Sequence, residues 1–392
     1  MARKIRENVF FINATDWNRR LFDSLIPLPD GTSYNAYLIK GSEKTVLIDA
    51  VDPALADILF EQLQEVERLD YIVSLHSEQD HSGSIPAVLE KYPDAKVLTS
   101  AKGKDQLLRH LLLEEEKITI VGDGEELSLG DKTLQFIYFP WVHWPETMFA
   151  YLKEDRILFT CDFFGSHLAT TDMYVSDECQ GYEAAKRYFA EIMMPFRNII
   201  RNNFSKLDPY DVDIIAPSHG PMYNNPRFIV DAYQDWLSDT VKNVVVIPYI
   251  SMHGSVGKMV QHLVAGLEEK GIKAHPFDLS VTDIGKLAIT LVDAATLVVG
   301  TPTVLGEPHP MVIYAVKLAN MLKPKTRYAS VMASYAWGGK AIEKIAEMIP
   351  NLKVEIIQPV LVKGHPTQAD FKAIDELVES IAERHRGLGE GA

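Results

Sequence analysis

Short apolar runs separated by turn residues dominate the first 240 residues and predict a β-rich region with few helices. The runs around the polar turn Lys40–Glu43 are typical of a hairpin. Leu55, Ile58, Leu59 and Leu63 recur at helical spacing after Pro53. Strands are expected at Val9–Asn13, Tyr34–Ile39, Thr45–Ile48, Leu69–Ser74, Lys96–Thr99, Thr133–Phe139, Met148–Leu152, Ile157–Thr160 and Val212–Ala216, and further helices at Pro86–Lys91, Tyr182–Asn202 and Pro226–Asp239.

The pattern changes near Val241, where strands and helices begin to alternate regularly. Such alternation with short Gly and Pro punctuation predicts an open, parallel, doubly wound sheet. Strands are expected at Val244–Ile250, Lys273–Phe277, Leu297–Gly300, Arg327–Met332 and Lys353–Gln358, and helices at Val256–Lys270 and Ala369–Arg386. The chain is therefore interpreted as an α/β protein with two domains, residues 1–240 and 241–392.

Metal-binding side chains are densest from His76 to His81, directly after an apolar strand. On an extended segment, residues two apart point the same way, so His76, Glu78 and Asp80 share one side, and a turn can bring His81 in. A solvated polar turn is the alternative, but such a turn does not require two histidines and two acids. Three further side chains, His143, Asp162 and His219, each follow a predicted strand.

The combined set offers four imidazoles and three carboxylates, enough for two metals bridged by a carboxylate. Nitrogen and carboxylate oxygen suit iron, manganese or zinc, and spacing alone does not choose among them. Glu78 adds an anionic oxygen donor, which favours a redox metal over a hydrolytic zinc pair.

A second candidate site lies at the ends of strands in the C-terminal half. Ser251-Met252-His253-Gly254-Ser255-Val256 leads from a strand into a helix, and backbone N–H groups at a helix N-terminus suit a phosphate. An ordinary βα turn is an equal alternative for this segment alone. Two more strand ends, Thr301-Pro302-Thr303-Val304 and Ser334-Tyr335-Ala336-Trp337-Gly338, favour a ligand at this edge, and Tyr335 and Trp337 offer flat faces for a flavin ring or for plain packing.

Composition narrows the classes of partner and compartment. The net charge of −15 argues against nucleic acid and against an anionic membrane surface. The two cysteines, Cys161 and Cys179, form no C-x-x-C pair, which argues against an in-chain rubredoxin or iron–sulfur site. There is no apolar run of membrane-spanning length and no signal-peptide pattern, so a cytoplasmic protein is expected.

The order H-x-[HE]-x-D-H…H…D…H resembles the metallo-β-lactamase superfamily, whose fold is an αββα sandwich. With Glu78 and a second α/β domain, the chain resembles the flavodiiron proteins, or A-type flavoproteins, over nearly its whole length. The resemblance implies a flavodoxin-like second domain with non-covalent FMN and two irons. It implies that His76, Glu78 and His143 hold one iron, that Asp80, His81 and His219 hold the other, and that Asp162 bridges them.

The same resemblance implies an oxidoreductase. Electrons would come from an external donor, rubredoxin or reduced coenzyme F420, and would reduce O2 to water or NO to N2O. It also implies a head-to-tail homodimer or a dimer of dimers. A dizinc hydrolase of the same superfamily and a flavodoxin-like electron carrier remain the alternatives.

Three positions depart from the family pattern. Asp23 stands where many members have a histidine, and Phe189 follows Tyr188 where many have a second tyrosine. Val256 stands where a flavodoxin threonine usually donates to the FMN phosphate. The first two changes bear on the choice between O2 and NO, and the third removes one phosphate donor.

Overall fold

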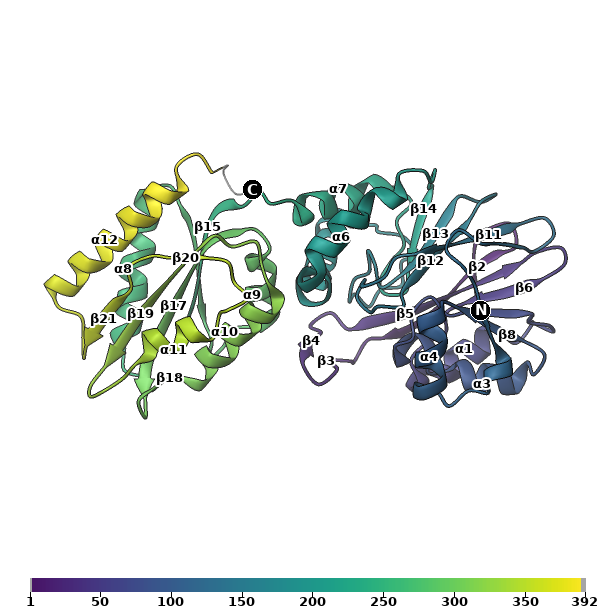
Figure 1. The fold of residues 1–392 in the computed structure, drawn as a ribbon, viewed down its shortest axis with the longest axis horizontal. Helices are drawn as coiled ribbons and strands as arrows, with labels where there is room; N and C mark the ends of the chain where they lie inside the picture. The colour runs from purple at the N-terminus through teal and green to yellow at the C-terminus, as the bar shows by residue number, and fades with distance from the viewer. Residues whose placement is uncertain (1, 389–392) are drawn as a thin grey trace. The chain divides into compact units, whose positions relative to one another are not determined.

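The computed structural model describes residues 2–388, which divide into two compact units. Unit 1 contains the chain up to Phe189 together with Phe196–Leu237, and unit 2 contains Ala190–Pro195 together with the chain from Ser238 onward. Figure 1 shows both as layered α/β structures. The exact domain division at residues 240 and 241 stays a prediction.

Unit 1 is built on two sheets. The first has seven strands in the order β1-β2-β5-β6-β7-β8-β9, and the second has five in the order β10-β11-β12-β13-β14. The antiparallel pairing of β5 with β6 confirms the hairpin around Lys40–Glu43. The bounds are β1 Arg3–Arg6, β2 Val9–Asp16, β5 Thr32–Lys40, β6 Thr45–Ile48, β7 Tyr71–Val73, β8 Lys96–Thr99, β9 Ile118–Ile120, β10 Glu126–Ser128, β11 Thr133–Tyr138, β12 Met148–Leu152, β13 Ile157–Cys161 and β14 Ile214–Pro217, with a separate hairpin of β3 Leu21–Phe22 and β4 Ile26–Pro27.

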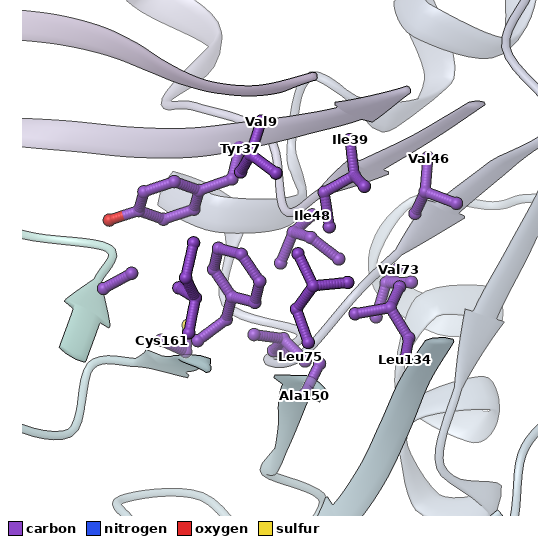
Figure 2. Packing of buried hydrophobic residues seen from close by; sticks show 14 of the residues in the cluster. Val9, Tyr37, Ile39, Val46, Ile48, Val73, Leu75, Leu134, Ala150 and Cys161 are labelled. Atoms are coloured by element: carbon purple, nitrogen blue, oxygen red, sulfur yellow. The ribbon is translucent and has the colours of Figure 1, made fainter. Parts of the chain in front are cut away.

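The two sheets enclose one apolar core. Figure 2 shows Tyr37, Ile39 and Ile48 of the first sheet packed against Leu134 and Ala150 of the second. The opposite face of the first sheet packs against α1, α3 and α4, because alternate residues of a strand point to opposite faces. Apolar residues on both faces make β5 buried from Thr32 to Ile39, which is typical of a central strand in an αββα sandwich.

We expect Leu134→Ala to lower the free energy of unfolding of unit 1 by about 3 kcal/mol, because Leu134 is fully buried between the sheets. Urea unfolding followed by tryptophan fluorescence measures this change. Leu112→Ala is the matched control, since Leu112 is 83% exposed and should change the free energy by less than about 0.5 kcal/mol. Equal losses for the two variants would contradict the assignment of Leu134 to the core.

The helices of unit 1 differ from the sequence prediction in two places. The predicted single helix Tyr182–Asn202 is wrong: α5 ends at Tyr188, a π-helical turn and a 3₁₀ turn cover 189–196, and α6 begins at Arg197. Pro195 has no N–H to donate, which accounts for a break there. The second difference is α4, Ala101–His110, for which the sequence pattern predicted no helix. The bounds are α1 Ala56–Gln62, α2 Gln79–Ser82, α3 Ile85–Lys91, α4 Ala101–His110, α5 Glu178–Tyr188, α6 Arg197–Asn203 and α7 Pro226–Leu237.

Unit 2 is a parallel sheet in the order β16-β15-β17-β19, with β20 and β21 both paired to β19. Helices α8 and α12 pack on one face, and α9, α10 and α11 pack on the other (Figure 1). This confirms the flavodoxin-like, doubly wound architecture. The bounds are β15 Lys242–Tyr249, α8 Ser255–Glu269, β16 Lys273–Asp278, α9 Ile284–Leu291, β17 Ala294–Val304, β18 Glu307–Pro308, α10 Pro310–Leu322, β19 Tyr328–Tyr335, α11 Ala341–Glu347, β20 Glu355–Ile356, β21 Val360–Lys363 and α12 Gln368–His385.

His385 fastens the end of α12 to the sheet of unit 2. Thr296 Oγ1 lies 2.7 Å from Nε2 of His385, and Asn243 Oδ1 lies 2.8 Å from Nδ1. Burial lowers the pKa of His385 from 6.5 to about 4. The folded state therefore holds the neutral imidazole, whereas the unfolded chain takes up a proton near pH 6.5.

We expect unit 2 to lose stability as the pH falls from about 6.5 towards 4, because the depressed pKa of His385 favours unfolding with proton uptake. The loss should be on the order of 2 kcal/mol. Unfolding free energies measured at several pH values should fall less steeply for His385→Gln than for the wild type. Identical slopes of unfolding free energy against pH for the two proteins would show that His385 does not contribute to the pH dependence of stability.

Within residues 2–388, the helices lack the combination of length and apolar character needed to cross a bilayer.

Candidate metal and flavin sites

The predicted metal-binding side chains follow strands at one edge of the unit 1 sandwich. His76 comes three residues after β7, and Asp80 and His81 lie in the short helix α2. Asp162 and His219 follow β13 and β14, which are neighbouring parallel strands. His143 lies in the turn between β11 and β12. The fold therefore brings together residues that are separated by up to 143 positions (219 − 76) in the sequence.

The first group consists of His76, Glu78, His143 and Asp162. Glu78 Oε2 lies 3.1 Å from Nε2 of His76 and 3.1 Å from Nε2 of His143. Asp162 Oδ2 lies 3.3 Å and 3.4 Å from the same two nitrogens. Four donor atoms thus face one another, two from imidazoles and two from carboxylates.

The second group consists of Asp80, His81 and His219, and it also meets Asp162. Asp80 Oδ2 lies 3.4 Å from Nε2 of His81 and 3.2 Å from Nε2 of His219. Asp162 Oδ1 lies 2.9 Å and 3.3 Å from these nitrogens. The two oxygens of Asp162 therefore face different groups, which is the arrangement of a carboxylate shared between two metals.

Electrostatics couple the donors tightly. Burial alone would raise the pKa of Asp162, but His81, His143 and His219 around it hold that pKa well below its usual range. Burial alone would lower the pKa of His219, but Asp162 and Asp80 raise it to about 10. Protons thus bind these nitrogens strongly, and any metal that binds there must displace them.

Hydrogen bonds from outside the groups orient two of the imidazoles. His76 Nδ1 lies 2.7 Å from Oε1 of the buried Glu146, and His219 Nδ1 lies 2.8 Å from the carbonyl of Ser33. An N–H at Nδ1 leaves the Nε2 lone pair free for a metal. His81 Nδ1 is buried and has no hydrogen-bond partner within residues 2–388, so hydrogen bonding restrains its ring less.

A thiol also borders the second group. Cys161 Sγ lies within 4.8 Å of ligand atoms of His81 and Asp162. Burial, followed by the charges of Asp49 and Asp162, raises the pKa of Cys161 well above its usual value. Cys161 is therefore a third kind of donor at the border of the second group, beside the imidazoles and carboxylates.

The predicted flavin-contact residues gather at the carboxyl ends of β15, β17 and β19. Ser255 Oγ lies 3.0 Å from Ser334 Oγ, which joins the first segment to the third. A β-carbon placed on Gly339 would lie 3.0 Å from Cγ2 of Thr303, so the third segment also lies against the second. These contacts bring the three predicted segments to one edge of the sheet.

Two details of this edge differ from the prediction. Thr301–Val304 was expected as a loop, but β17 continues to Val304 and pairs with β18, because the chain turns back at Leu305-Gly306. Ser334 and Tyr335 likewise still belong to β19. Val256, in the first turn of α8, is fully buried and belongs to the apolar core between α8 and the sheet.

Comparison with known proteins decides the family. The model of the ODP family beta lactamase matches residues 32–220. The chain is 34% identical to a nitric oxide reductase of Moorella thermoacetica, with 97% of this chain and 98% of the relative covered. It is 32% identical to the flavo-diiron protein FprA2 of Clostridium acetobutylicum, with 91% and 92% covered. The chain belongs to the flavodiiron protein family. The solved rubredoxin oxygen:oxidoreductase of Desulfovibrio gigas superposes with a TM-score of 0.95 at 27% identity, covering 98% of this chain and 99% of that one.

The donor geometry fits the two irons of a flavodiiron protein. Ligand atoms about 2.1 Å from one ion, at tetrahedral or octahedral angles, are about 3.0–3.4 Å apart. The spacings within both groups run from 2.9 to 3.4 Å. Both carboxylate oxygens of Asp80 and of Asp162 are buried without a hydrogen-bond partner in the described chain. Positive charge compensates buried carboxylates, and here protonated imidazoles or two metal ions in their place can supply it.

The edge of unit 2 fits the FMN of the family. Gly254 has a φ of 84°, a conformation that glycine adopts without strain and that turns successive N–H groups toward one point at the start of α8. Tyr335 is half-buried at the end of β19, and Trp337 is 70% exposed. A phosphate and a flat ring both find suitable contacts here.

Sequence reasoning missed two buried acids that support the flavodiiron metal centre. Glu146 binds His76 and also accepts from the N–H of Ser77 at 3.0 Å. Asp49 accepts from the N–H of Leu75 at 2.8 Å and from Ser218 Oγ at 3.2 Å, so it joins two of the strand ends that carry ligands. Asp49 itself follows the predicted strand Thr45–Ile48, and the same strand-end criterion that selected Asp162 would have found it.

The two departures near the metal centre have different surroundings. Tyr188 is buried, and its ring centroid lies 5.8 Å from that of His219. Phe189 packs instead against Tyr233 and Trp236. Asp23 lies in the β3–β4 hairpin, where partial burial and the charges of Glu78 and Asp80 raise its pKa. Of the two departures, Asp23 is thus the one that places a new chemical group near the metal ligands.

Proposed function

We propose that this flavodiiron protein is an oxidoreductase that takes electrons from an external donor through FMN to a diiron centre and reduces O2 to water or NO to N2O. The reactions balance as O2 with four electrons and four protons giving two waters, and two NO with two electrons and two protons giving N2O and one water. The observation that carries the proposal is Asp162, whose two oxygens face two separate groups of nitrogen and oxygen donors.

The proposed ligands divide between two ions. His76, Glu78 and His143 would hold one iron, Asp80, His81 and His219 would hold the other, and Asp162 would bind both. The proposed FMN contacts are the segments Ser251–Val256, Thr301–Val304 and Ser334–Gly338. When bound, FMN accepts electrons in pairs and passes them on singly, and the iron pair supplies them to the gas.

The side chains around the ligands have identifiable tasks. Glu146 holds the His76 ring, and the Ser33 carbonyl holds the His219 ring, so both nitrogens keep their direction. Trp144 lies edge-on to His76 with centroids 5.0 Å apart, and Tyr34 lies edge-on to His219 at 5.5 Å. The two rings pack against one imidazole of each ligand group.

Metal and flavin content test the proposal against a hydrolase. The purified protein is expected to contain two irons and one FMN per chain, measured by elemental analysis and by the visible flavin spectrum after acid release. Two zincs without flavin would overturn the reductase proposal in favour of a dizinc hydrolase.

Rapid mixing then assigns the substrate. The anaerobically reduced protein, mixed with O2 or with NO, should show FMN reoxidation at the flavin absorbance maximum with the preferred gas. Failure of both gases to reoxidise the protein would contradict the proposed activity.

The electron donor and the assembly belong to the same proposal. We propose rubredoxin or reduced coenzyme F420 as the donor, a cytoplasmic location, and a head-to-tail homodimer or dimer of dimers. Donor-dependent gas consumption distinguishes the two donors, and light scattering coupled to size-exclusion chromatography measures the assembly. A monomer in solution would contradict the proposed assembly but would leave the proposed reaction unaffected.

A further inference from the structure

The predicted phosphate-binding segment of unit 2, residues 251–257, has no lysine or arginine and no hydroxyl at position 256. Val256 is fully buried and has no polar group. Ser251 Oγ already accepts from the N–H of Gly257 at 3.0 Å, and Ser255 Oγ is shared with Ser334 Oγ. His253 is the one imidazole within residues 251–257. On a chain with a net charge of −15, a second imidazole from elsewhere in unit 2 would add a donor to those of this segment.

His365 comes from a distant part of the sequence to this segment. It follows β21, and the N–H of the preceding Gly364 donates to the carbonyl of Tyr335 at 2.9 Å. That bond ties the His365 turn to the end of β19, which carries two of the proposed flavin contacts, Ser334 and Tyr335. Beyond the chain neighbours of Gly254, a β-carbon placed on Gly254 would meet one atom within 4 Å in the described structure, Cε1 of His365 at 4.0 Å.

Open space therefore lies above Gly254, with the His365 imidazole at its border. The His365 ring is exposed and makes no hydrogen bond or ion pair with any residue in 2–388. The nearest acid in sequence, Asp370, is already engaged, since it accepts from the backbone N–H and from Oγ1 of Thr367 at 2.7 Å each. The imidazole keeps at least one N–H donor in either charge state.

We propose that His365 is a phosphate-binding residue of the FMN site, with a ring N–H that replaces the hydroxyl donor lost at Val256. The inference rests on the proposed function in one respect, that this edge of unit 2 binds FMN. A hydrogen bond to a phosphate oxygen is charge-assisted and therefore stronger than a neutral one.

Flavin binding by the full-length, FMN-depleted protein tests this assignment. Quenching of flavin fluorescence gives the dissociation constants of FMN and of riboflavin, which lacks the phosphate. His365→Ala is expected to weaken FMN binding by about 10- to 100-fold and to leave riboflavin binding within about twofold. His365→Gln retains an N–H donor and should recover most of the FMN affinity. His262→Ala is the control, because His262 lies on α8, the helix that begins at the proposed phosphate site, but pairs with Asp375.

Two results would overturn the assignment. One is an unchanged FMN dissociation constant in His365→Ala. The other is an equal loss for FMN and riboflavin, which would mean that the ring supports the shape of the site and does not bind the phosphate. A wild-type protein that binds neither flavin would refute the proposed function itself, and this outcome is distinguishable because it needs no variant.

Discussion

Replacement of Asp162 by alanine should remove iron from both halves of the metal centre. Its two oxygens face separate donor groups, so both groups lose one anionic donor and the connection between them. The substitution also removes the negative charge that the imidazoles of His81, His143 and His219 face in the wild type. We expect iron affinity and gas reduction to fall by more than about a hundredfold, since even supporting residues around a metal cost 10- to 100-fold.

Iron and FMN per chain, measured on the same sample, check this prediction. FMN content should stay at the wild-type level, because the proposed flavin contacts belong to unit 2. Asp213→Ala is a suitable control, since Asp213 is a surface partner of Arg156 and should leave iron unchanged. A variant of Asp162 with full iron occupancy would contradict the bridging role.

Glu146→Gln should produce the second largest effect on the metal centre. The glutamate is 2% exposed and accepts from His76 Nδ1 and from the N–H of Ser77. The amide keeps the size of the side chain but removes the charge that favours an N–H at Nδ1. We expect the iron affinity to fall by about 10- to 100-fold, as is usual for a carboxylate that orients a metal-bound histidine.

Competition with a chelator measures the iron affinity. Activity at saturating iron shows whether Glu146 serves only to hold iron, by orienting His76, or is also needed for turnover. If Glu146 orients His76, saturating iron should recover much of the turnover of Glu146→Gln. Glu90→Gln on the surface of α3 is the matched control. Iron affinity equal to that of the wild type would show that the His76 ring is held by packing alone.

Local sequence patterns determined a large part of this fold. Strands such as β5, β8 and β12 lie where apolar runs predicted them, because a strand buried on both faces needs a continuous apolar run. The regular alternation after Val241 predicted the parallel sheet of unit 2 for a similar reason, since each crossover helix carries its own apolar face. Boundaries were less predictable: β17 runs on to Val304 because it finds a partner in β18, a contact that no local pattern encodes.

The sequence alone also determined the chemical content of the metal centre, through the dense segment His76–His81 and three metal-binding side chains at strand ends. Only the tertiary structure decided which donors face each other. The assignment of one oxygen of Asp162 to each group depends on β13 and β14 lying side by side, and this is a consequence of pairing between distant segments. The supporting role of Glu146 also became visible only in the tertiary structure, because Glu146 is recognised by its contact with His76, which is 70 positions away in the sequence.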